Sequence, residues 1–139
     1  MAKLRPYLLI VEAEELIADI TSFRLELLGY DVRVASRGEQ VAALLQQRQP
    51  NLFIIDLRLP GLSGLALIEQ VTASEATGGI PVLAISLDAE TDQVQQAFSA
   101  GASDYLVAPF DPLVLEDKVA SLIDLGRTPS ATTREGIAR

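Results

Sequence analysis

Two carboxylates, each directly after a short apolar run, are the residues best placed to do chemistry. Asp56 follows residues 52–55 (LFII), and Glu12 follows residues 7–11 (YLLIV). Both runs are unbroken and too short for helices, so they predict buried strands of a parallel sheet. In open α/β sheets, ligands and reacting groups gather at the carboxyl ends of the strands. The alternative is that Asp56 merely ends a strand and accepts hydrogen bonds from loop amides.

The residue types that the chain lacks narrow this chemistry. There is no cysteine and no histidine, which removes thiol nucleophiles, thiolate metal sites and disulfides. It also removes imidazole bases, imidazole metal ligands and a phosphohistidine carrier. The segment VEAEELIA after the first run is acidic, where a phosphate cradle would need bare amides. We therefore do not expect an enzyme, and a flavin or nucleotide site is the least favoured alternative.

Composition sets the class of protein. The 139 residues are 49% hydrophobic, enough for one globular domain with a proper core. The net charge of −8 would be repelled by phosphate backbones, so we expect no direct binding to nucleic acid. The N-terminus does not resemble a signal peptide, and no segment has the ~20 apolar residues needed to span a bilayer. We expect a cytoplasmic protein that is not bound to membranes.

Strand and helix patterns alternate along the chain. Strands are expected at 7–11, 30–35, 52–55, 80–86 and 104–107, and helices at 14–28, 38–47, 64–73, 89–100 and 112–125. This rhythm predicts an α/β fold with a five-stranded parallel sheet, helices on both faces and the flavodoxin-like strand order. The domain is expected to span residues 1–126, and residues 127–139 to form a disordered tail or the start of a linker.

Apolar residues at helical spacing predict the faces that pack on the sheet. The four of the first helix are Leu16, Ile20, Phe23 and Leu27, with Gly29 as the stop. Elsewhere the expected core-facing residues are Val41, Leu44, Leu45, Leu67, Ile68, Val71, Val94, Ala97, Phe98, Phe110, Leu115, Val119, Leu122 and Ile123.

Several phrases in order resemble the receiver domain of bacterial two-component response regulators. They are the acid after LLIV, the acid in FIID, the LPG turn followed by SG, the hydroxyl in VLAIS, and AGASDYLVAPF, which is similar to the family's AGAxDYLxKPF. The resemblance covers roughly residues 5 to 125. It implies the same flavodoxin-like fold and a place in phosphorelay signalling.

The resemblance also implies roles for individual residues. Asp56 stands at the position that accepts a phosphoryl group from a histidine kinase. Magnesium would be held by Glu12, Asp56 and the backbone carbonyl of Arg58. Ser86 stands at the position of the switch hydroxyl and Tyr105 at that of the switch aromatic.

Three positions depart from the family's pattern. Ala13 replaces a metal-binding acid, Ala108 replaces the lysine of the KPF phrase, and Leu87 replaces a small residue beside the switch hydroxyl. Phosphoryl transfer needs positive charge at the transferring oxygens, and magnesium needs oxygen ligands. We therefore predict a pseudo-receiver that binds magnesium weakly or not at all. The alternative is a receiver that still accepts phosphate on Asp56.

Two further expectations concern charge and partners. The guanidinium of Arg58 could pair with Glu12 and Asp56 in place of a metal, whereas the simpler interpretation is a solvated loop arginine. The resemblance implies that the fourth helix, fifth strand and fifth helix, roughly residues 91–123, contact a protein partner. A histidine kinase and a second copy of the chain are candidate partners.

Overall fold

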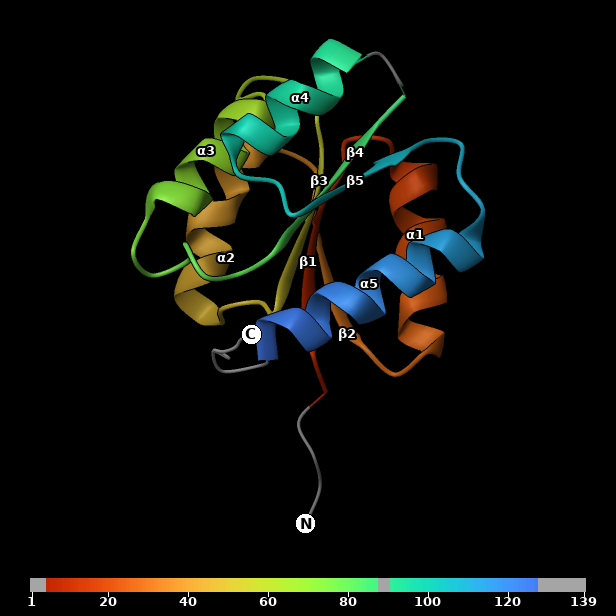
Figure 1. Ribbon diagram of the computed structural model, residues 1–139. Helices are drawn as coiled ribbons and strands as arrows, with labels where there is room; N and C mark the ends of the chain where they lie inside the picture. The colour runs from red at the N-terminus through yellow and green to blue at the C-terminus, as the bar shows by residue number, and fades with distance from the viewer. Residues whose placement is uncertain (1–4, 88–90, 128–139) are drawn as a thin grey trace, which may run out of the picture.

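The computed structural model describes residues 5–87 and 91–127 and contains one five-stranded sheet between two layers of helices (Figure 1). The parallel strands are β1 (Tyr7–Val11), β2 (Asp31–Ala35), β3 (Leu52–Asp56), β4 (Val82–Ser86) and β5 (Asp104–Val107). Their order is β2-β1-β3-β4-β5, which confirms the predicted flavodoxin-like arrangement.

The helices divide between the two faces of the sheet (Figure 1). Helices α1 (Glu15–Leu27) and α5 (Pro112–Arg127) cover one face. Helices α2 (Val41–Gln47), α3 (Gly64–Ala73) and α4 (Thr91–Ala100) cover the other, and a short 3₁₀ turn, Gly38–Gln40, precedes α2. Within residues 5–87 and 91–127, no helix has the length and apolarity that a bilayer crossing requires.

The core lies on both sides of the central strands. Successive residues of β1 alternate between the two faces, with Leu9 and Val11 packing toward α2–α4 and Leu8 and Ile10 toward α1 and α5. This alternation is why the central strands are apolar throughout rather than at every second position. Strand β2 is half-buried or exposed over most of its length, because it lies at the edge of the sheet.

The boundaries of the elements agree with the sequence within about two residues, except that the helix predicted at 38–47 begins with the 3₁₀ turn at 38–40. Helix α5 runs to Arg127, one residue beyond the predicted end of the domain at residue 126. The remainder of the predicted tail, residues 128–139, lies outside the described residues. So do residues 89 and 90, where the fourth helix was expected to begin.

The prediction of which side of α1 is buried is wrong. The side chains of Leu16, Ile20, Phe23 and Leu27 are 70%, 55%, 62% and 70% exposed, and α1 packs on the sheet through Ala18, Thr21 and Leu25. The small Ala18 and Thr21 bring the helix backbone close to the strands, and the larger side chains point outward.

The prediction for Phe98 is also wrong, because that ring is 45% exposed and α4 buries Ala97 beside it. Phe110 is partly buried and packs against the core cluster on the α1–α5 face. The predicted faces of α3 and α5 are confirmed, since Leu67, Ile68, Val71, Leu115, Val119, Leu122 and Ile123 are all buried.

Candidate functional site

The predicted acids meet at the carboxyl edge of the sheet. Val11 of β1 stands opposite Ile55 of β3 in the parallel register, so the residues that follow them, Glu12 and Asp56, are neighbours. Asp56 in turn stands opposite Ile85 of β4, one residue before Ser86. Three of the residues that the sequence singled out are therefore positioned by adjacent central strands.

Glu12 is a buried carboxyl group. Its side chain is 4% exposed, its backbone N–H donates to the carbonyl oxygen of Ala35 at 2.9 Å, and its Oε2 accepts from the backbone N–H of Glu14 at 3.1 Å. The pKa of Glu12 is raised to about 8, first by burial and then by a side-chain hydrogen bond with Asp56, which together outweigh the opposing amide of Glu14. Burial and the neighbouring carboxyl group of Asp56 therefore both favour the protonated form of Glu12.

The backbone after Asp56 folds back onto its carboxylate. The N–H of Arg58 donates to Asp56 Oδ1 at 2.8 Å. The side chain of Arg58 is exposed, and none of the ion pairs among the described residues joins it to Glu12 or Asp56. In the structure Arg58 therefore has the arrangement of a solvated loop arginine, the simpler of the two interpretations.

The start of α3 fixes the loop that carries Asp56. The N–H of Gly64 donates to the carbonyl oxygen of Leu57 at 3.2 Å, and a Cβ at Gly64 would overlap the carbonyl oxygen of Asp56. Only glycine allows this close approach. The side chain of Ser63 caps the helix by accepting from the N–H of Ala66 at 3.1 Å.

Ser86 and Tyr105 are both buried, at 1% and 8% exposure. The hydroxyl of Ser86 donates to Oε1 of Gln93, in the first turn of α4, at 3.0 Å. The ring of Tyr105 belongs to the core cluster on the α2–α4 face. Sequence reasoning did not identify Gln93, because a glutamine on a helix carries no signal of a tertiary partner.

Neither Ala13 nor Ala108 supplies the charged side chain that the family's pattern has at its position. Ala13 is exposed and offers no side-chain oxygen, and Ala108, which precedes the cis peptide bond to Pro109, packs beside the α1–α5 core cluster. Lys118 donates to Asp104 Oδ2 at 2.9 Å, so its ammonium group is engaged between α5 and β5. Lys3, the other lysine, lies outside the described residues.

An apolar cavity lies where a charged side chain was expected. It has a volume of about 330 Å³ and lies between α1, the end of β4 and the start of α5. Its lining includes Ile17, Ile20, Leu87, Ala108, Phe110 and Leu115. Two of the three departing positions, Leu87 and Ala108, thus face an apolar space.

The donors at this edge do not fit a hard divalent cation. They are the carboxyl groups of Glu12 and Asp56 and the carbonyl oxygen of Arg58, and within residues 5–87 and 91–127 no group of three or more acidic side chains could hold a metal. Magnesium favours near-octahedral oxygen ligands, whereas here Ala13 offers no side-chain oxygen beside Glu12.

Comparison with known proteins identifies the same family that the sequence resembles. The family model for the response regulator receiver domain matches residues 8–120. The DNA-binding dual master transcriptional regulator RpaA of Synechocystis sp. is 36% identical over 118 residues, 85% of this chain and 49% of RpaA. The phosphate regulon transcriptional regulatory protein PhoB of Pseudomonas aeruginosa is 32% identical over 116 residues, 84% of this chain and 51% of PhoB. The chain spans about half the length of these curated relatives.

Solved structures agree with the fold. A CheY-like response regulator receiver domain protein from Methanospirillum hungatei has a TM-score of 0.83 at 26% identity, covering 90% of this chain and 98% of that one. The receiver domain of the sensor histidine kinase PA1611 from Pseudomonas aeruginosa has a TM-score of 0.80 at 25% identity, covering 87% and 99%. That structure holds a magnesium ion in its active site cleft.

Proposed function

Since this chain belongs to the response regulator receiver domain family, we propose that it is an atypical receiver of two-component signalling whose Asp56 accepts phosphate weakly or not at all. The side chains at two departing positions carry this proposal: Ala13 offers no oxygen to a metal, and Ala108 offers no ammonium group to the transferring oxygens. Among residues 5–87 and 91–127, the one lysine, Lys118, is engaged by Asp104, and no group of three acidic side chains could hold a metal.

We expect the activation barrier for phosphoryl transfer to Asp56 to stay high. A carboxylate that attacks a phosphoryl group must approach negative oxygens, and each preorganised electrostatic group that is lost typically costs about 3–4 kcal/mol. Ala13 and Ala108 remove two such groups, and their effects need not add. We accordingly propose that magnesium binds weakly or not at all, and that the chain is a signalling module rather than an enzyme.

The output of such a module is a protein contact. We propose that partners bind the face formed by α4, β5 and α5, roughly residues 91–123. Exposed apolar side chains on these helices, Phe98, Leu113 and Val114, support a contact there. A histidine kinase is the partner that the family suggests, while a location in the cytoplasm and the absence of direct nucleic-acid binding remain predictions.

The test is intact mass after incubation with a small acyl phosphate and magnesium. We expect no added phosphoryl group on the natural chain, and Asp56→Asn gives the baseline. The double variant Ala13→Asp with Ala108→Lys restores an acid and a cation, and we expect it to gain one phosphoryl group at Asp56. A phosphoryl mass on the natural chain that disappears in Asp56→Asn would contradict the proposal and favour the competent receiver.

A further inference from the structure

The outer side of α1 carries a regular apolar stripe. Leu16, Ile20, Phe23 and Leu27, here named the α1 seam, are each more than half exposed and follow one another at spacings of four, three and four residues. The stripe is roughly 16 Å long at the rise of an α-helix. Residues that large and that regularly spaced on a solvated helix face mark a contact surface rather than scattered exposure.

The spacing of the α1 seam is that of a coiled coil. Leu16 and Phe23 take heptad position d, and Ile20 and Leu27 take position a. Leu25, at position f on the opposite side, is fully buried against the sheet. One side of α1 therefore packs on the sheet of its own domain. The other side presents two pairs of a and d residues, and a second helix could pack against them.

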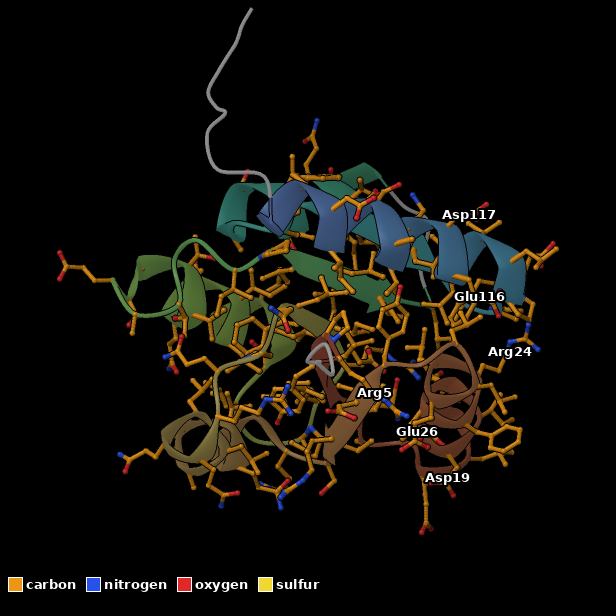
Figure 2. All side chains as sticks on the ribbon, turned by 90° about the horizontal axis from the view of Figure 1, so that it is seen from below. Arg5, Asp19, Arg24, Glu26, Glu116 and Asp117 are labelled. Atoms are coloured by element: carbon orange, nitrogen blue, oxygen red, sulfur yellow. The ribbon has the colours of Figure 1, made fainter. Side chains whose placement is uncertain are left out.

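Charged residues beside the seam indicate how a second helix would lie. Position g holds Asp19 and Glu26, and position e holds Arg24. Figure 2 shows Arg24 on the side of α1 that faces α5 and Glu116, with Asp19 and Glu26 away from it. Arg24 donates to Glu116 Oε2 from Nε at 3.0 Å and from Nη2 at 2.6 Å, which fixes its guanidinium beside the seam.

We propose that a second copy of this chain covers the α1 seam, with the two α1 helices parallel and in register. In a parallel pair, each residue at position g lies beside the position-e residue of the other helix that comes five positions later in the sequence. Asp19 of each copy therefore lies beside Arg24 of the other copy, which gives two such pairs. In an antiparallel pair g meets g′, which would bring Asp19 against Glu26 and repel. The charge pattern thus matches a second copy in one orientation and opposes the other.

The net charge sets the strength of this contact. Each copy carries −8, and this repulsion is screened within about 8 Å at physiological ionic strength. A seam of four residues buries a small interface, so the dimer is weak and depends on concentration. It forms more readily at about 0.15 M salt than at about 0.01 M, because the screening length shortens from roughly 30 to 8 Å over that range. The contact does not involve Asp56, so it is independent of the proposed function.

A cysteine-free chain allows a direct test. Leu16→Cys and Leu27→Cys are made separately, and each is held under mild oxidation at about 0.15 M salt. In the parallel pair, equivalent cysteines face each other within the roughly 7 Å that a disulfide permits between Cα atoms, so each variant cross-links with itself. In an antiparallel pair neither does, and only a mixture of the two cross-links.

The control is Leu125→Cys, at a similarly exposed leucine on α5 that lies outside the proposed partner face of residues 91–123. We expect Leu16→Cys and Leu27→Cys each to form disulfide dimers much faster than this control. Sedimentation of the cysteine-free chain should show a dimer that Ile20→Glu abolishes and Leu125→Glu retains. Cross-linking at the control's rate, cross-linking only in the mixture, or a monomer at every concentration would overturn the proposal.

Discussion

Glu12 is a buried carboxyl group whose pKa lies far from its ordinary value. Its pKa is raised from 4.5 to about 8, so between these values the folded protein binds a proton that the unfolded chain has released. Stability linked to this group is fully present below about pH 4.5 and is lost as the pH rises through about 8. The amount is on the order of a few kcal/mol, because each tenfold change in proton affinity corresponds to roughly 1.4 kcal/mol.

We expect Glu12→Gln to remove this pH dependence. A neutral amide can still donate to Asp56 and has no proton to lose. Urea unfolding followed by circular dichroism at about pH 6 and about pH 9, on either side of the raised pKa, should show a free energy of unfolding that falls for the natural chain and stays nearly level for the variant. Equal changes in the two proteins would contradict a buried Glu12 with a raised pKa.

Gly64 is a second residue at which a substitution should clearly lower stability. A methyl group there would overlap the carbonyl oxygen of Asp56, and neither backbone can give way easily, so Gly64→Ala should cost about 2 kcal/mol or more in the free energy of unfolding. Gly79→Ala is the matched control, since a Cβ there meets nothing within 4 Å. If both variants unfold at the same urea concentration, the close approach of α3 to Asp56 is not as described.

Among the elements, α1 provides the clearest test of burial. Leu25 and Leu27 lie two residues apart on one helix, with exposures of 0% and 70%. We expect Leu25→Ala to lower the free energy of unfolding by about 2–5 kcal/mol, and Leu27→Ala to change it by less than about 0.5 kcal/mol. The measurement is urea unfolding of dilute protein, and a larger loss for Leu27→Ala would reverse the orientation of the helix.

The same helix shows what periodicity can and cannot predict. The pattern located α1 within one residue of each end because apolar spacing and a terminal glycine are local signals. It assigned the wrong side to the sheet because a stripe of large apolar residues indicates a contact, without saying whether the contact is with the protein's own sheet. Burial of Ala18 and Thr21 follows from the closeness of α1 to the sheet, which is a tertiary property.

For the site, the sequence predicted which strand ends carry acids and which expected groups are missing. The register of the strands makes Glu12 and Asp56 neighbours, as the βα rhythm implied. The raised pKa of Glu12 and the hydrogen bond from Ser86 to Gln93 could not be predicted. The first depends on how deeply the Glu12 side chain is buried, and the second on how α4 meets β4.

At the scale of the whole molecule, the charge is strongly unbalanced. Nineteen acidic residues against eleven basic ones repel one another in the compact state. The ion pairs among the described residues are mostly exposed on at least one partner, so they offset little of this repulsion.

We therefore expect salt to stabilise the protein. The midpoint of thermal unfolding, followed by circular dichroism, should rise when ionic strength increases from about 0.01 M to about 0.15 M, as the screening length shortens from roughly 30 to 8 Å. Potassium and sodium chloride should act alike, which separates screening from specific binding of one cation. A midpoint that falls with salt would mean that the ion pairs outweigh the net repulsion.

The hydrogen bond from Ser86 to Gln93 should also affect how fast α4 opens locally. It joins the buried end of a central strand to a helix that is otherwise mostly polar on its surface, so the first turns of that helix should open only when the end of the strand also loosens. Amide hydrogens in the second turn of α4 should then exchange with deuterated solvent slowly, at a rate closer to that of the strands than to that of a loosely docked surface helix.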